Sequence, residues 1–150
     1  MKRHAIRRDK VEIYLHILWT TWDRLPLIEA GWQRELHEVI GAAFQKEHCR
    51  VIAINGVCDH VHCLIAIRST TRLCDIIKTA KGTSAVFAGQ RCQYFKWRPT
   101  YAAFSVSRWD VAQIQNYIRG QKRHHANGTL NDDLECFDEE ISEEENTHDS

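Results

Sequence analysis

Hydrophobic residues mark four short stretches of the chain as strands. Residues 11–21 are rich in β-branched and aromatic side chains, and their apolar positions recur at every second residue. This period predicts a strand with one buried face. Similar apolar runs predict two strands at residues 50–55 and 60–68, and a fourth strand at residues 101–106.

Helical spacing of apolar residues separates these strands. Over residues 31–48 apolar side chains recur three and four positions apart, which predicts an amphipathic helix of about four turns. A second apolar stripe begins after the hydroxyl residues at 69–71, which can act as N-caps, and ends near Gly89. A last helix is expected over residues 111–127.

The predicted order of elements is β-α-β-β-α-β followed by one helix. It indicates an α+β fold of the ferredoxin-like, split βαβ type, in which an antiparallel sheet carries helices on one face. The last helix is an addition to that fold and bears Tyr117. A chain of 150 residues is long enough for one domain with a proper core.

The balanced net charge hides a strong asymmetry. All 20 Lys and Arg residues lie within residues 1–130 with 10 acidic residues, whereas residues 131–150 hold the other 10 acidic residues and no base. We therefore expect a domain at residues 1–130 and an acidic, disordered tail at residues 131–150, of which only residues 134–137 dock on the body. The basic body favours nucleic acid as a partner, although clustered charge can also serve solubility alone. The tail either competes with nucleic acid for the basic face or only keeps the protein soluble.

The cysteines and the apolar segments indicate the compartment. Six cysteines are scattered along the chain without CxxC spacing, which argues against a disulfide framework. The amino terminus is followed by further charges rather than by an apolar leader, and no stretch is long enough to cross a bilayer. These features predict a protein of the reducing cytoplasm without membrane attachment.

His60-Val61-His62 is the first candidate for chemistry. Alternate residues of a strand share a face, so the two histidines would lie with Cα atoms about 6.5 to 7 Å apart and could bind one metal ion, while Val61 faces the core. Cys58 would join the histidine face if the strand extended that far. A histidine pair on a strand is more often a half-buried surface feature, so the motif alone favours metal binding only weakly.

Tyr117 and Gln121 form the second candidate. They are four residues apart on one face of the last predicted helix, with Cβ atoms about 6 Å apart. The amide oxygen of Gln121 could bind a metal ion, and the phenol of Tyr117 could act as a nucleophile. Taken alone, Tyr117 would more often pack into the core like its neighbours Ile114 and Ile118.

Together with a third segment, these motifs resemble one known family. The matching segments are, in chain order, His60-Val61-His62, Trp97-Arg98-Pro99-Thr100-Tyr101-Ala102-Ala103-Phe104-Ser105-Val106-Ser107 and Asn116-Tyr117-Ile118-Arg119-Gly120-Gln121-Lys122-Arg123-His124-His125. The resemblance covers most of residues 10–127. It is to the HUH-type single-tyrosine transposases, and in particular to their REP-associated branch.

This resemblance implies a metal-dependent enzyme of DNA recombination. It assigns Tyr117 as the nucleophile that cleaves single-stranded DNA with hairpins and forms a 5′-phosphotyrosine link. It assigns His60, His62 and Gln121 as ligands of Mg²⁺ or Mn²⁺. The released 3′-hydroxyl can later attack the link, which makes the enzyme an endonuclease and strand transferase. Two imidazoles suit zinc or manganese better than magnesium, and a structural zinc site is an alternative.

Basic residues beside the nucleophile predict how DNA is held. Arg119, Lys122, Arg123 and His124 could bind the cleaved strand, although cations at a helix end also favour its dipole without any DNA. In the better-known branch of the family two chains exchange the tyrosine helix, so a homodimer with a shared site and a monomer are both open. The alternative function is a non-catalytic DNA or RNA hairpin-binding module that keeps the fold.

Overall fold

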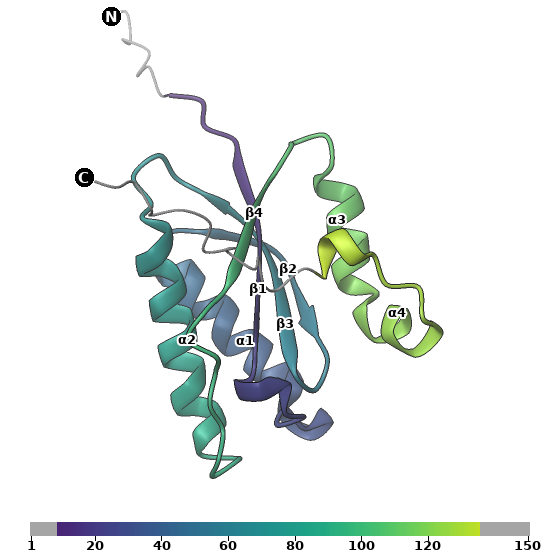
Figure 1. Cartoon of the computed structure of the whole chain (residues 1–150). Helices are drawn as coiled ribbons and strands as arrows, with labels where there is room; N and C mark the ends of the chain where they lie inside the picture. The colour runs from purple at the N-terminus through teal and green to yellow at the C-terminus, as the bar shows by residue number, and fades with distance from the viewer. Residues whose placement is uncertain (1–8, 136–150) are drawn as a thin grey trace, which may run out of the picture.

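The strands and helices follow the predicted order, with two short helices after the last strand instead of one long one. A computed structural model of the chain describes residues 9–135 (Figure 1). The elements are β1 (Ile13–Thr20), η1 (Trp22–Arg24), α1 (Ala30–Lys46), β2 (Arg50–Gly56), β3 (His60–Ile67), α2 (Leu73–Gly89), β4 (Ala102–Val106), α3 (Val111–Arg119), α4 (Gln121–Asn127) and η2 (Asp132–Leu134). The α+β, ferredoxin-like prediction is confirmed.

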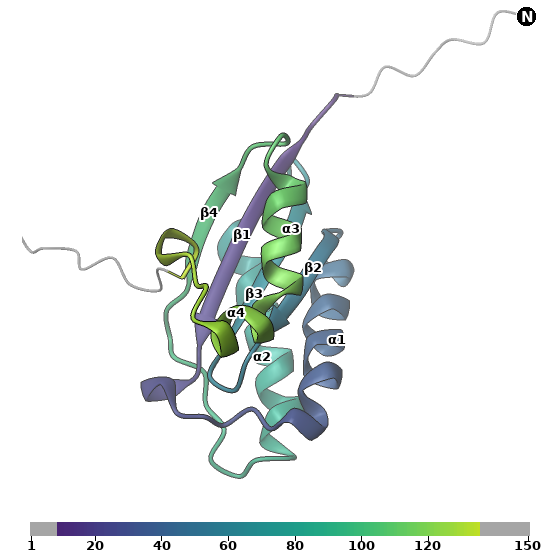
Figure 2. The same cartoon turned by 90° about the vertical axis from the view of Figure 1, so that its right-hand side faces the viewer.

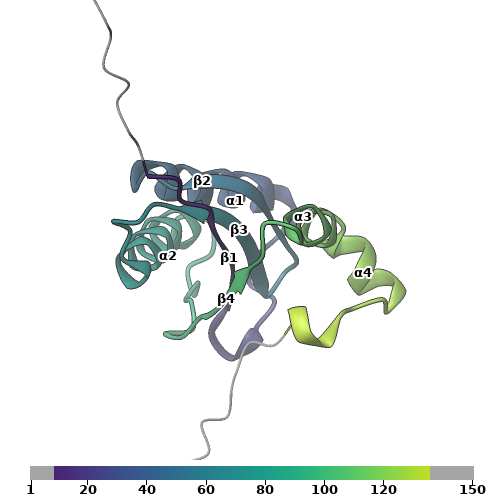
Figure 3. The same cartoon turned by 90° about the horizontal axis from the view of Figure 1, so that it is seen from above.

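The four strands form one antiparallel sheet in the order β2-β3-β1-β4. Both central strands, β3 and β1, are therefore paired on each side. Helices α1 and α2 cover one face of the sheet, and α3 and α4 lie across the other face (Figures 2 and 3). This arrangement leaves one face of the central strands for a large core and the other for the functional residues.

Strand alternation divides the side chains between these two faces. Ile17, Trp19, Val61 and Cys63 are buried in the main core under α1 and α2, as the sequence predicts for Val61. On the opposite face a much smaller buried cluster joins α3 to the sheet. Its members are Ala53, Leu64, Ile114 and Ile118.

The prediction of one continuous last helix is wrong, because the helix breaks at Gly120. This residue has φ −89° and ψ 10°, so its backbone leaves helical geometry although its N–H still donates to the carbonyl of Asn116. Apart from proline, glycine has the weakest helix preference, and it has no side chain to hold the turn. The break precedes Gln121, the first residue of α4, which is fully buried.

The hydroxyl cap predicted for the second helix is also wrong, and the strand does not extend to Cys58. Helix α2 begins at Leu73 without a side-chain cap, and the hydroxyl of Thr71 instead accepts a hydrogen bond from the N–H of Arg68 at 3.0 Å. Strand β3 begins at His60, so Cys58 lies exposed in the connection before it and not on the histidine face.

The tail prediction falls mostly outside the described residues, as do Cys136 and the amino-terminal residues 1–8. Within the described part, Leu134 is half-buried and packs against the small cluster under α3. The division of the chain at residue 130 stays a prediction. Among residues 9–135 the five cysteines are free, and no helix has the length and apolar character needed to span a membrane.

Candidate active site

His60 and His62 point from β3 toward α3 and α4. Both side chains are fully buried, with ring centroids 5.1 Å apart and ring planes at 75°. A shift of β3 by one residue would move Val61 and Cys63 out of the main core, so the core holds the histidine pair in register.

Each histidine uses Nδ1 for a neighbouring side chain. Nδ1 of His60 donates to Oδ1 of Asp59 at 2.6 Å, because a carboxylate can only accept. Nδ1 of His62 lies 2.8 Å from Nε2 of His16 on β1. Both Nε2 atoms therefore face the site, which is the arrangement of metal-binding histidines with an orienting partner behind each ring.

Helices α3 and α4 bring Tyr117 and Gln121 to the histidines of the same chain. Oε1 of Gln121 lies 3.3 Å from Nε2 of His60, and the ring centroid of Tyr117 is 6.2 Å from that of His62. The structure thus places all four residues of the predicted metal and nucleophile site together.

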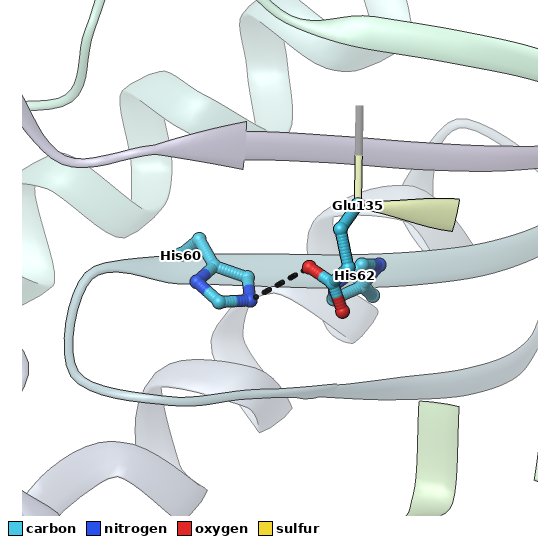
Figure 4. A group of neighbouring side chains, drawn as sticks. All are labelled: His60, His62 and Glu135. Carbon is cyan, nitrogen blue, oxygen red and sulfur yellow. Dashed lines mark hydrogen bonds and ion pairs between the residues drawn. The ribbon is translucent and has the colours of Figure 1, made fainter. Parts of the chain in front are cut away.

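Glu135 lies at the centre of this group, and the sequence did not single it out. Its Oε2 is 3.1 Å from Nε2 of His62 and 3.5 Å from Nε2 of His60 (Figure 4). Its Oε1 accepts hydrogen bonds from the hydroxyl of Tyr117 at 2.7 Å and from the amide of Gln121 at 2.9 Å. His60, His62 and Glu135 offer three ligand atoms within 4.8 Å of one another, which makes them a candidate metal-binding triad.

Burial and this carboxylate set the protonation states of the site. Burial alone would raise the pKa of Glu135, but the hydrogen bond and the charge attraction of His62, with hydrogen bonds from Tyr117 and Gln121, lower this pKa to about 2. Burial also lowers the pKa of His62 and brings that of His16 to about 3, so both rings are neutral at pH 7. Burial and the hydrogen bond to Glu135 raise the pKa of Tyr117 to about 12, which keeps its hydroxyl protonated.

Two further histidines border the site. Nε2 of His125 lies 3.2 Å from Nε2 of His60 and 3.0 Å from Oε1 of Gln121. The ring of His124 stacks on that of Tyr117, with centroids 4.7 Å apart and planes at 19°. The helical spacing of Gln121 and His125 is a signal from which the position of His125 could have been predicted.

The other predicted DNA-binding residues lie beside the site and not within it. Arg119, Lys122 and Arg123 are exposed and line an open groove of about 620 Å³ at the break between α3 and α4. Lys122 also lines a second groove, of about 590 Å³, which Arg34 and His37 of α1 share.

The fold points to a class of protein. Its four-stranded antiparallel sheet with helices matches the fold of the tyrosine transposases, enzymes that nick and join DNA. The model of the family described as "Transposase IS200 like" matches residues 9–121. The chain belongs to this family of IS200-like transposases.

Individual relatives agree with this assignment. The ISDra2 transposase TnpA of Deinococcus radiodurans is 26% identical over 118 residues, which cover 73% of this chain and 84% of the relative. A crystal structure of a D. radiodurans R1 protein described as a transposase is 24% identical, with a TM-score of 0.63 over 81% of this chain and 98% of the other. The structure of a REP-associated tyrosine transposase bound to a REP hairpin is 14% identical, with a TM-score of 0.61 over 87% and 76% of the two chains.

Proposed function

We propose that this transposase is a metal-dependent endonuclease and strand transferase that acts on single-stranded DNA with hairpins through a 5′-phosphotyrosine intermediate. The observation that carries the proposal is the meeting of the Tyr117 hydroxyl and the Nε2 atoms of His60 and His62 at one point, the carboxylate of Glu135. The nucleophile and the metal ligands are thus within reach of one phosphate group.

The side chains present fit a divalent cation. His60 and His62 present Nε2, Gln121 presents Oε1 close to His60, and Glu135 adds a carboxylate oxygen. This mixed nitrogen and oxygen set suits Mn²⁺, and it suits Mg²⁺ when fewer of the nitrogens bind the ion. Among the described residues, these four donors include no thiolate that would select zinc. When bound, the ion would withdraw charge from the phosphate oxygens and so assist attack by a poor nucleophile.

Tyr117 supplies the attacking oxygen. Its phenolic oxygen forms a bond to phosphorus while the bond from phosphorus to the 3′ oxygen breaks, and the leaving oxygen takes up a proton as a 3′-hydroxyl. A 3′-hydroxyl reverses these steps when it attacks the phosphotyrosine and returns the proton to Tyr117. The hydroxyl donates to Oε1 of Glu135, which leaves the lone pairs of the oxygen available for the attack and places the carboxylate to take up the phenolic proton.

The basic grooves beside the site provide a surface for the nucleic acid. Arg119, Lys122 and Arg123 form a cluster of exposed positive charge, and Lys122 connects the two grooves. Such a surface binds phosphates of any sequence, while hairpin choice depends on shape. A relative of the same fold has been solved with a REP hairpin, which supports DNA hairpins as the substrate class.

The organisation of the active protein is part of this proposal. We place the catalytic domain at residues 1–130, and Glu135 joins its site from the segment that follows. Tyr117 lies against His62 of its own chain, which favours a site formed in cis, and a homodimer would not be needed to complete it.

A covalent adduct tests the proposed function. The full chain with Mn²⁺ or Mg²⁺ and a hairpin oligonucleotide with a single-stranded flank should give a band of protein linked to DNA in a denaturing gel. Tyr117→Phe should abolish the band, whereas Tyr94→Phe, which alters an exposed tyrosine, should leave it unchanged. An adduct that persists in Tyr117→Phe would contradict the assignment of the nucleophile.

Two other outcomes identify the alternatives. If the wild-type protein binds the hairpin but forms no adduct with any divalent ion, it is a non-catalytic hairpin-binding module. If a chelator unfolds the protein and one equivalent of zinc restores it, the site is structural.

A further inference from the structure

The most unusual neighbour of the candidate metal site is another histidine, His16. It stands on β1 and is 1% exposed, and its Nε2 lies 2.8 Å from Nδ1 of His62. The two rings are stacked, with centroids 5.1 Å apart and planes at 17°. His16 contacts Nδ1 of His62, whereas Nε2 of His62 faces the site. His16 therefore lies behind His62 and cannot bind the same metal ion.

The backbone fixes this contact firmly. β1 pairs with β3 on one side and with β4 on the other, so His16 stands opposite Leu64 in one strand and Phe104 in the other. Its ring also lies against that of Phe104, with centroids 6.5 Å apart. The partner of His62 is therefore held by the sheet itself and not by a loop.

We propose that His16 is the positioning residue of His62, an uncharged partner that directs Nε2 of His62 toward the metal ion and exchanges hydrogen-bond roles with it when the ion binds. This inference rests on the proposed metal site. It assigns the two histidine ligands different partners, since His60 has the carboxylate of Asp59 behind it and His62 has a neutral imidazole.

The state in the structure defines the first of the two roles. Nε2 of His62 faces Oε2 of Glu135 at 3.1 Å, and a carboxylate can only accept, so Nε2 carries the proton. Neutral His62 then has a free lone pair on Nδ1. His16 must therefore donate from its Nε2 to Nδ1 of His62.

Binding of an ion requires the opposite role. A metal ligand offers its lone pair, so Nε2 of His62 has to lose its proton, and neutral His62 then carries a proton on Nδ1. His16 must now accept at Nε2 and hold its own proton on Nδ1. One proton crosses the hydrogen bond from His16 to His62, and His62 passes its Nε2 proton to solvent by way of Glu135. His16 takes one proton up from solvent at Nδ1, so each ring keeps one proton and none is gained or lost overall.

This exchange explains why an imidazole serves here better than a carboxylate. A buried carboxylate at this position could accept from His62 in the loaded state but could never donate to it in the state that faces Glu135. Glutamine can play both roles by turning its amide, whereas leucine fills the space and can play neither.

Metal affinity provides the first test, with Mn²⁺ alone as the probe and isothermal titration calorimetry as the assay. His16→Leu should weaken Mn²⁺ binding by about 10- to 100-fold, the usual effect of losing an orienting partner, and His16→Gln should restore most of the affinity. His48→Asn is the control, because His48 is an exposed histidine in the connection before β2 and asparagine tolerates its positive φ of 63°. Unchanged affinity in His16→Leu, or an equal loss in the leucine and glutamine variants, would overturn the proposal.

The proton positions provide the second test and need no variant of His16. Nitrogen-15 NMR of the wild-type imidazoles should find the His16 proton on Nε2 in the metal-free protein and on Nδ1 with Zn²⁺ as a diamagnetic probe. A proton that stays on Nε2 of His16 in both states would refute the exchange. His60→Ala separates this inference from the proposed function: if that variant binds Mn²⁺ like the wild type, the metal site itself is wrong.

Discussion

Glu135→Gln would remove the charge from the centre of the site while keeping the shape of the side chain. In the folded protein the pKa of Glu135 falls from 4.5 to about 2, which corresponds to about 3 kcal/mol of preference for the charged form. An acidic group whose pKa is lower in the folded protein stabilises that protein at pH values above the pKa of the unfolded chain. This stabilisation is lost as the pH falls through the pKa of the folded protein. At pH 7 His62 is neutral and only the hydrogen bonds to Glu135 remain, so the variant should be less stable than the wild type by less than about 3 kcal/mol, and the difference should shrink between pH 4.5 and pH 2.

Urea unfolding of the metal-free protein, followed by tryptophan fluorescence, measures this difference. Asp132→Asn is the matched control, since Asp132 is an exposed acid of the same segment and should change stability by less than about 0.5 kcal/mol. If Glu135→Gln is as stable as the wild type at pH 7, Glu135 is not held among the histidines in solution. That result would also contradict the inclusion of Glu135 in the candidate metal-binding triad.

Three other substitutions test the surroundings of the site. Gly56→Ala should cost about 1–3 kcal/mol in urea unfolding, because a Cβ there would meet the backbone carbonyl across the β2–β3 hairpin, while Gly82→Ala in open space should cost nothing. Asp59→Asn should weaken Mn²⁺ binding at least about tenfold in calorimetry by removing the carboxylate behind its histidine neighbour, and equal affinity would show that this contact orients nothing. Lys122→Gln should lower the slope of log affinity against log salt for hairpin DNA by about 1, whereas a loss as large in Lys78→Gln, on α2, would show a diffuse charge effect.

The sequence predicts the sheet well because strand and helix periods come from burial. The histidine pair is visible in the sequence for the same reason: period two places His60 and His62 on one face and Val61 in the core. The helix break at Gly120 is harder to predict, since an isolated glycine only weakens a helix and its effect depends on what the following residues can bury.

The contacts around the histidines depend on tertiary structure and leave little trace in the sequence. In the sequence, His16 is only one residue within an apolar strand, and its contact with His62 arises when β1 pairs with β3. Asp59 precedes His60 in a connection that shows no motif of its own. Glu135 is one of ten acidic residues in the last segment. The one local signal for Glu135 is its apolar neighbour Leu134. Leu134 packs against the small cluster under α3 and so places the adjacent carboxylate near the histidines.

The unequal cores on the two faces of the sheet also predict how the site opens. The histidines belong to β3, a central strand backed by the main core, whereas Tyr117 belongs to helices joined to the sheet by a small cluster. Amide hydrogen exchange should therefore be fast in α3 and α4 and slow in β3, as for two cooperative units of different local stability. Tyr117, the proposed nucleophile, would detach and return many times while the proposed metal ligands stay in place, which would let a long DNA strand enter a site that the folded chain encloses.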